Sequence, residues 1–295
     1  MRFGLIILPI ERWSVQADQW RRAESYGFDH AWTYDHLTWD PLAGTPWGAT
    51  MPTLVAAAGV TSQIPLGTWV TSPNFRHPVT FAREIAALDD VSNGRAMVGI
   101  GAGTIGSDAR VLGEALLPAA DRAERLEEFV DLLDAVLTQQ VTDHQGRFYT
   151  ADEALTTQPC VQRPRPPVLV AAGGPRLMRL AARLDGWISN GSAAADDAAD
   201  DETWWRDLAG FTRRFEDVAA AAGADPAAIP KYLSVDAAPT FSLTSVEVFR
   251  DVVGRASQLG YTDVVAHWPL PGAAKYNAPE SMLEAIAAEL DGLRS

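Results

Sequence analysis

The chain has 295 residues, of which 47% are hydrophobic, and its formal net charge is −14. A chain this acidic lacks the basic surface that general nucleic-acid binding and docking on anionic membranes require. No apolar run approaches the ~20 residues of a membrane-spanning helix, and the first residues show no secretory signal. Cys160 is the single cysteine, which excludes an internal disulfide. We expect a cytoplasmic protein with neither a nucleic-acid partner nor a membrane partner.

Strand-like and helix-like segments alternate along the sequence. In chain order, the strand candidates are Phe3 to Leu8, His30 to Tyr34, Pro65 to Val70, Ala96 to Ile100, Val168 to Ala171, Gly186 to Asn190, Lys231 to Val235 and Asp263 to His267. Strands that alternate with helices are typical of a parallel sheet, and eight such units predict a (β/α)8 TIM barrel with insertion segments. We expect a single domain over residues 1–295, with a doubly wound open sheet as the alternative.

Three other segments have a clear local pattern. A helix is predicted from Asp121 to Leu137, where apolar residues recur at three- and four-residue spacing. His77 and Pro78 predict the start of another helix, because proline suits the first helical turn. The stretch from Gln139 to Pro166 is predicted to be an irregular insertion of the kind that forms lids or binding loops.

Two apolar runs end in small residues and precede a predicted helix. One ends in Gly101, Ala102, Gly103 and Thr104, and the other ends in Ala172, Gly173 and Gly174. Without bulky side chains, backbone N–H groups approach an anion closely, and the start of a helix adds partial positive charge. Glycines also make tight turns without any ligand. The pair of segments favours one extended, phosphate-bearing cofactor.

Barrel active sites lie at the carboxyl ends of the strands, so the residues after each strand are the candidates. Asp35 and His36 follow the second strand, and His36 is the best general acid or base because histidine exchanges protons near neutral pH. The alternative is a loop histidine held by its neighbour. Too few histidines and carboxylates gather at strand ends for a metallohydrolase, so no metal is expected. Trp39 and Trp47 are candidates for a pocket that holds a flat ring, or else ordinary anchors.

The sequence resembles the bacterial luciferase-like monooxygenase family over most of its length. The resemblance rests on motifs at the predicted strand ends, in their order and spacing. These are Asp35-His36-Leu37, Gly67 to Pro73 with Arg76-His77-Pro78, Leu88 to Arg95 leading to Gly99 to Gly103, and Arg163 to Pro167 leading to Ala171 to Gly174. The resemblance implies a barrel oxidoreductase that uses FMN or the deazaflavin coenzyme F420, and the deazaflavin branch fits the motifs better.

The same resemblance implies roles for individual residues. His36 would exchange a proton beside the reactive ring, and Asp35 would hydrogen-bond the ring region or the histidine. Trp69 and Val70 match a position where relatives have a non-proline cis peptide behind the ring. The remaining implied cofactor contacts are Thr71, Ser72, Gly101, Gly103, Thr104, Ala172, Gly173 and Gly174.

The resulting functional prediction is a hydride transfer between coenzyme F420 and a small organic substrate. One alternative is an FMN-dependent monooxygenase that uses O2 and reduced flavin from a separate reductase. A second alternative is a barrel that binds flavin without catalysis. Members of the family often dimerise, so the resemblance implies a homodimer. Thr104 stands where several deazaflavin sugar-phosphate dehydrogenases have a glutamate acid or base, which argues against that substrate.

Overall fold

The computed structural model describes residues 1–39, 42, 44–191 and 200–294. Eight strands form a closed barrel in the order β1-β10-β9-β8-β7-β4-β3-β2. Neighbouring strands pair in parallel, as in β1 with β10 and β3 with β4. The TIM barrel predicted from the alternation of strands and helices is therefore confirmed, and the open sheet is excluded.

The strands of the barrel lie close to where the sequence places them. They are β1 (Arg2–Ile6), β2 (His30–Thr33), β3 (Leu66–Thr71), β4 (Ala96–Gly101), β7 (Val168–Ala171), β8 (Gly186–Ser189), β9 (Lys231–Ser234) and β10 (Asp263–His267). Each predicted strand is present. The bounds of β7 and β10 match the prediction, and no end of the other strands shifts by more than two residues. Most strand residues are buried on both faces, which explains their nearly continuous apolar sequences.

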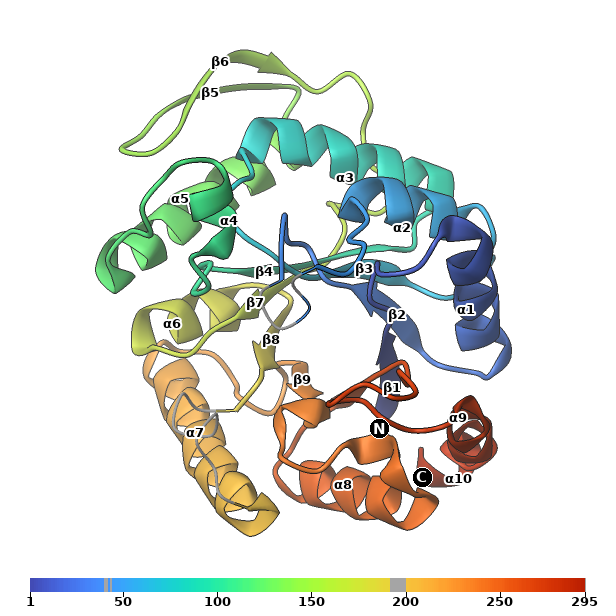
Figure 1. Cartoon of the computed structure of the whole chain (residues 1–295). Coiled ribbons are helices and arrows are strands. Elements are labelled where there is room, and N and C mark those ends of the chain that lie inside the picture. Colours follow the sequence, from blue (N-terminus) through green and yellow to red (C-terminus); the bar gives the residue numbers. More distant parts are fainter. Residues whose placement is uncertain (40–41, 43, 192–199, 295) are drawn as a thin grey trace. The chain divides into compact units, whose positions relative to one another are not determined.

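The helices complete the fold. The longer ones are α1 (Trp13–Ser25), α2 (Thr50–Ala58), α3 (Pro78–Ser92), α5 (Ala119–Thr138), α6 (Pro175–Arg183), α7 (Asp201–Ala221), α8 (Val246–Gln258) and α9 (Glu280–Ala287). The short ones are α4 (Ser107–Val111), α10 (Leu290–Leu293) and the 3-10 turns η3 (Val235–Ala237) and η4 (Ser242–Thr244). Figure 1 labels the α-helices and the strands along the chain.

The chain divides into two compact units. One unit contains residues 1–8, 21–32 and 169–295, and the other contains residues 9–20 and 33–168. We expect one domain from the sequence, and this remains a prediction. We describe each unit separately below.

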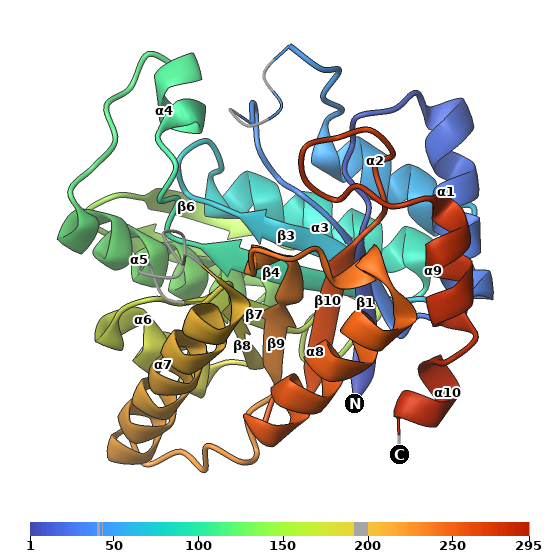
Figure 2. The same cartoon turned by 60° about the horizontal axis from the view of Figure 1, so that its bottom comes forward.

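The second unit contains β3 and β4 with α2, α3, α4 and α5. The predicted helix from Asp121 to Leu137 is confirmed as α5, whose apolar side buries Leu126, Phe129, Val130 and Leu133. The predicted start of α3 is confirmed as well. Pro78 occupies the first turn, and the ring of His77 accepts a hydrogen bond from the backbone N–H of Val79. Figure 2 shows α4 set apart from α5 and joined to it by an extended segment.

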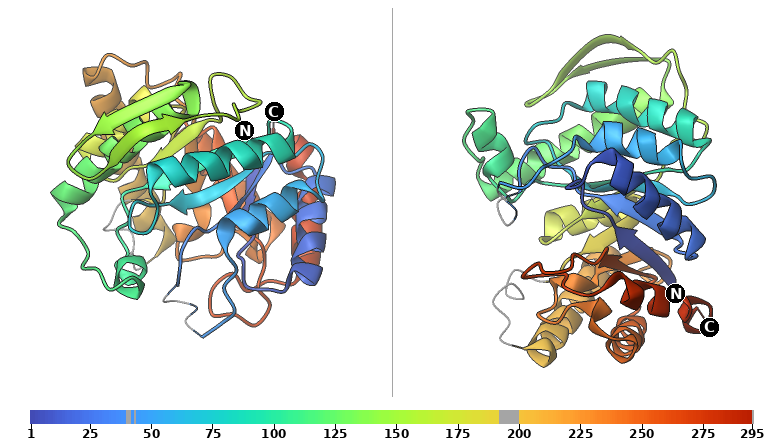
Figure 3. Two further views of the ribbon diagram at one scale, coloured as in Figure 1. Left: turned by 90° about the horizontal axis from the view of Figure 1, so that it is seen from above. Right: turned by 45° about the vertical axis from the view of Figure 1, so that its right-hand side comes forward.

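The insertion from Gln139 to Pro166 is not irregular throughout, so this prediction is wrong in part. Its first half is an antiparallel hairpin of β5 (Val141–Gln145) and β6 (Thr150–Leu155). Both views of Figure 3 show the hairpin on the outer side of α3, where the guanidinium of Arg83 donates to the carbonyl of Leu155. The alternating pattern of the hairpin is weak because both strands expose polar side chains, so the sequence did not indicate it.

The first unit contains β1, β8, β9 and β10 with the helices from α6 onward. A buried polar network links β2 and β10 within it. Trp32 Nε1 donates to His30 Nδ1 over 2.6 Å, and His30 Nε2 donates to Asp263 Oδ1 over 2.9 Å. Because Nδ1 of His30 accepts, Nε2 must be the protonated nitrogen. Both imidazole nitrogens are thus engaged, which makes His30 a structural residue.

Candidate cofactor site

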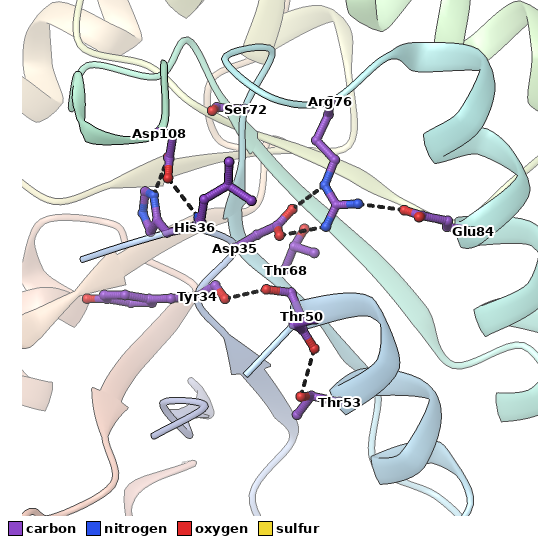
Figure 4. Close-up of polar contacts among 12 residues, drawn as sticks. Tyr34, Asp35, His36, Thr50, Thr53, Thr68, Ser72, Arg76, Glu84 and Asp108 are labelled. Carbon is purple, nitrogen blue, oxygen red and sulfur yellow. Dashed lines mark hydrogen bonds and ion pairs between the residues drawn. The ribbon is translucent and has the colours of Figure 1, made fainter. Parts of the chain in front are cut away.

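The residues that follow β2 send their side chains in different directions. The carboxylate of Asp35 lies beside Arg76, whereas the ring of His36 lies beside Asp108 (Figure 4). Neighbouring residues of an extended segment face opposite ways, which accounts for the divergence. The two adjacent acid–base candidates therefore have separate partners. The resemblance implied that Asp35 contacts the ring region or the histidine, but the histidine is held by Asp108 instead.

Asp35 forms a bidentate ion pair with Arg76. Arg76 Nη2 donates to Oδ1 over 2.7 Å and Nε donates to Oδ2 over 3.0 Å, while Nη1 reaches Glu84 over 2.7 Å. Burial disfavours the charged guanidinium, but the charge and hydrogen bonds of Asp35 outweigh it and raise the pKa of Arg76. With both oxygens engaged, Asp35 anchors the end of β2 to the loop before α3.

Asp108 connects the β2 segment to α4. Its Oδ2 lies 2.7 Å from His36 Nδ1, and its Oδ1 accepts from the backbone N–H of Leu37 over 2.7 Å. The N–H of Thr38 lies 3.5 Å from the same Oδ1. The carboxylate is 1% exposed and the imidazole 13%, so the pair is largely shielded from water. A histidine in such a setting is well oriented for proton exchange.

Aromatic rings pack around His36. The ring of Trp39 lies 4.8 Å from the imidazole and the ring of Tyr34 lies 6.1 Å from it, between centroids. Trp47 Nε1 donates to the backbone carbonyl of His36 over 2.8 Å. Both tryptophans predicted from the sequence thus lie at the histidine. They offer apolar faces beside a polar, proton-exchanging group.

The end of β3 has an unusual backbone, and one hydroxyl at each of the ends of β2 and β3 and the start of α4 is unpaired. The peptide bond between Trp69 and Val70 is cis, as the resemblance implied. Among the described residues, the buried hydroxyls of Thr33, Thr71 and Ser107 have no hydrogen-bond partner. An unpaired buried hydroxyl is costly, and a polar ligand would satisfy it. Ser72, by contrast, accepts weakly from the backbone N–H of Asn74 over 3.4 Å.

The glycine segment after β4 makes a turn held by Asn74. The Asn74 amide donates to the carbonyls of Gly103 and Ile105 over 3.1 and 3.2 Å. Gly103 has a φ of 68°, and a Cβ there would lie 2.3 Å from Asn74 Nδ2. The turn alone therefore requires the glycine. Gly101 is buried, Ala102 is half-buried and Thr104 is exposed, and α4 is only five residues long. Phosphate binding by this segment remains a prediction.

The other small-residue segment lies in the first unit, at the start of α6. Gly174 is the N-cap and contributes no side-chain hydrogen bond, and Pro175 occupies the first turn. A Cβ at Gly173 or Gly174 would meet nothing within 4 Å, so the backbone is open to an incoming group. Ala172 is buried, and its carbonyl accepts from Trp187 Nε1 over 3.0 Å. An uncapped helix start with open glycines is typical of an anion site.

Sequence reasoning missed two residues that hold the site together. Arg76 stood in a quoted motif, but nothing in its spacing indicated that it pairs with Asp35. Asp108 lies 72 positions from His36, and a lone aspartate in a short helix gives no sequence signal. Within the described ranges, no group of three or more histidines, cysteines or carboxylates could hold a metal ion. No helix in the described part of the chain has the length and apolar character to span a membrane.

Comparison with known proteins connects this geometry to a family. The family model described as Luciferase-like monooxygenase matches residues 1–239. An uncharacterized protein of Mycobacterium tuberculosis is 29% identical over 309 residues, which cover 98% of this chain and 99% of that protein. An F420-dependent glucose-6-phosphate dehydrogenase of Amycolatopsis mediterranei is 34% identical over 174 residues, which cover 57% of this chain and 50% of the dehydrogenase. The latter alignment thus spans about half of the dehydrogenase.

A solved structure shows the same fold over the whole chain. It is an F420-dependent secondary alcohol dehydrogenase in complex with an F420-acetone adduct. Its TM-score is 0.79 at 19% identity, and the match covers 100% of this chain and 99% of that one. The resemblance noted in the sequence is confirmed, because the family model matches most of the chain. The chain therefore belongs to the luciferase-like monooxygenase family and is an oxidoreductase.

Proposed function

We propose that this oxidoreductase uses coenzyme F420 to exchange a hydride with a small organic substrate. The observation that carries the proposal is His36, held on Asp108 and surrounded by Tyr34, Trp39 and Trp47. Such a residue exchanges protons in a place from which water is largely excluded. The printed name of the Amycolatopsis relative supports F420 as the cofactor.

The residues present fit a flavin-like ring. The buried hydroxyls of Thr33, Thr71 and Ser107 need hydrogen-bond partners, and the ring of a flavin or deazaflavin offers carbonyl and N–H groups. When bound, the cofactor would supply the hydride chemistry, while the protein positions the ring and moves the proton. Gly173 and Gly174, with the uncapped start of α6, are the predicted contacts of the phosphate end.

In this proposal, each predicted residue has a limited task. His36 exchanges the proton of the substrate through Nε2, because its Nδ1 faces Asp108. Trp39 and Trp47 line the substrate side of the histidine. Trp69, Val70, Thr71 and Ser72 support the ring, and Asp35 orients the segment through Arg76 rather than by direct contact. Gly101, Gly103 and Thr104 are retained as predicted cofactor contacts.

The substrate is proposed only as a class, a small alcohol or the corresponding carbonyl compound. The family resemblance implies that several deazaflavin sugar-phosphate dehydrogenases have a glutamate at the position of Thr104, which is exposed here. A threonine hydroxyl does not act as an acid or base near neutral pH. This departure argues against glucose 6-phosphate, the substrate in the name of the Amycolatopsis relative.

An FMN-dependent monooxygenase is the second candidate, because the matching family model is described as Luciferase-like monooxygenase. It would need O2 and a separate reductase that supplies reduced flavin. The two candidates share the ring site but differ in the atom at which the ring reacts. With either candidate function we also propose that the protein is a homodimer. Light scattering on the purified protein would test this.

The deciding experiment begins with purification from a host that makes F420. We expect the absorbance spectrum of F420 to co-purify, and a titration of the stripped protein to give tighter binding of F420 than of FMN. Incubation with 2-propanol under anaerobic conditions would then bleach the bound F420. Tighter binding of FMN, together with O2 consumption when reduced FMN is added, would establish the monooxygenase instead.

A further inference from the structure

Asp108 has a role that the geometry around His36 defines. We infer that Asp108 is a positioning residue that fixes the tautomer of His36, with the proton on Nδ1 and the lone pair on Nε2. This inference rests on the proposed function for its catalytic meaning, but its physical content is a property of the cofactor-free protein.

The first argument concerns the hydrogen bond between the two side chains. An ionised carboxylate only accepts hydrogen bonds, and the 2.7 Å between Oδ2 and His36 Nδ1 is a short, charge-assisted distance. Nδ1 must therefore be the donor. A neutral imidazole has one N–H, so Nε2 is left as the acceptor.

The second argument concerns the other oxygen of Asp108. Oδ1 accepts a hydrogen bond from the backbone N–H of Leu37 over 2.7 Å, and a backbone N–H can only donate. The carboxylate is thereby held by both of its oxygens and is 1% exposed. Its orientation relative to the imidazole is fixed by the backbone of the β2 segment itself.

The third argument concerns the segment that carries Asp108. The loop before α4 is fastened by Asn74, whose amide donates to the carbonyls of Gly103 and Ile105. Arg125 of α5 donates to Asn74 Oδ1 over 2.5 Å and so orients that amide. A chain of hydrogen bonds from α5 to the loop thus supports the placement of Asp108.

The fourth argument concerns what else faces the imidazole. Tyr34 and Trp39 present ring contacts, and Trp47 contacts the backbone carbonyl of His36. Among the described residues, the only hydrogen-bond partner of the ring is Asp108. Nε2 is thus the nitrogen left to meet a substrate hydroxyl.

The consequence is a defined direction of proton transfer. If bound F420 serves as the hydride acceptor when an alcohol is oxidised to its carbonyl compound, the role of His36 would be to take up the hydroxyl proton at Nε2. The adjacent carboxylate of Asp108 would stabilise the imidazolium that results. Without a lone pair on Nε2, this proton would have no acceptor at His36.

The substitution Asp108→Asn separates this role from a structural one. The amide oxygen would stay on the Leu37 N–H, because that group can only donate, so the NH2 group would face His36 Nδ1. Nδ1 must then accept, and the proton of the neutral ring moves to Nε2. The variant keeps the size of the side chain and the backbone hydrogen bond, but inverts the tautomer.

The test is NMR on cofactor-free protein labelled with ¹⁵N-histidine, recorded at alkaline pH. His36→Gln identifies the His36 signals. We expect Nδ1 of His36 to be protonated in the wild type and unprotonated in Asp108→Asn. An unprotonated Nδ1 in the wild type, or the same state in both proteins, would overturn the inference. If Asp108→Asn does not fold, the wild-type spectrum alone decides.

His144 serves as an internal control, because its Nε2 lies 3.2 Å from Glu128 Oε1, and its signals should be identical in both proteins. Asp121→Asn is the matched control variant, since Asp121 lies on α5 and pairs with Arg147 of the hairpin between β5 and β6. It should leave the signals of His36 unchanged.

The functional arm uses F420 and 2-propanol as probes. We expect Asp108→Asn to bind F420 within about threefold of the wild type and to reduce it at least ~100-fold more slowly, a loss typical of misplaced acid–base groups. Equal rates would contradict the inference. If the wild type binds no F420, the proposed function fails, whereas the NMR result on the tautomer still stands.

Discussion

Asp35 and Arg76 are joined by two hydrogen bonds, from Nη2 to Oδ1 over 2.7 Å and from Nε to Oδ2 over 3.0 Å. The carboxylate is 2% exposed and the guanidinium 15%, so both charges have left water. Removing either member of such a pair destabilises the fold, because the remaining charge is then buried without its partner. The pair therefore positions the β2 end that carries His36.

Asp35→Ala should lower the free energy of unfolding by about 3 kcal/mol, the usual cost of removing one partner of a buried pair. Denaturant unfolding monitored by circular dichroism measures it. Glu84→Gln is the matched control. Its side chain is 42% exposed, so its contact with Arg76 should contribute less than about 1 kcal/mol. Equal losses in the two variants would show that Asp35 is not the anchor.

Glu128 predicts a pH dependence for the hairpin of β5 and β6. It accepts from the backbone N–H groups of Arg147, Phe148 and Tyr149 and from His144 Nε2. Burial alone would raise the pKa of Glu128, but the hydrogen bonds from Tyr149, His144 and Phe148 outweigh it and lower the pKa below its ordinary value. Because the folded-state pKa is depressed, the stabilisation is present above the unfolded-state pKa.

As the pH falls through the folded-state pKa of Glu128, that stabilisation should be lost. Hydrogen exchange of residues 141–155 should accelerate in acid, by a change of about 2 kcal/mol in local opening. In Glu128→Gln, hydrogen exchange of these residues should already be fast at neutral pH and should change little as the pH is lowered. A hairpin that opens equally in both proteins at every pH would disprove this role.

Cys160 predicts slow thiol chemistry. The side chain is 2% exposed, and burial together with the charge of Asp89 raises the pKa of Cys160 to about 11. Because the thiolate is the reactive form, alkylation by iodoacetamide near neutral pH should be slow in the folded protein and fast after denaturation. Mass spectrometry of the alkylated fraction against time measures it. Rapid alkylation of the native protein would contradict the buried placement.

Much of the fold could be predicted because buried apolar residues recur in regular patterns along the chain. Most barrel strands are short runs of largely apolar residues, and the buried side of α5 appears in the sequence as a periodic pattern. The hairpin of β5 and β6 could not be predicted in this way. Its strands expose alternate polar residues and depend on contacts with Glu128, which lies on another element.

The candidate site was only partly predictable from sequence. His36, Trp39 and Trp47 lie close together in the sequence after β2, so contacts among them could be expected from the sequence alone. Asp108 and Arg76 reach the β2 segment from distant elements, and their contacts depend on tertiary packing. The resemblance to a known family indicated the cis peptide at Trp69, but it gave no sign that Asp108 is the partner of His36.

The measurement that tests the account most directly is the reduction of F420 by His36→Ala with 2-propanol as the probe. Since the imidazole moves the proton but contributes little to cofactor binding, F420 affinity should stay within about tenfold of the wild type. Turnover should fall by two orders of magnitude or more, the usual contribution of a general acid or base. Wild-type turnover in His36→Ala, at equal F420 occupancy, would contradict the central claim.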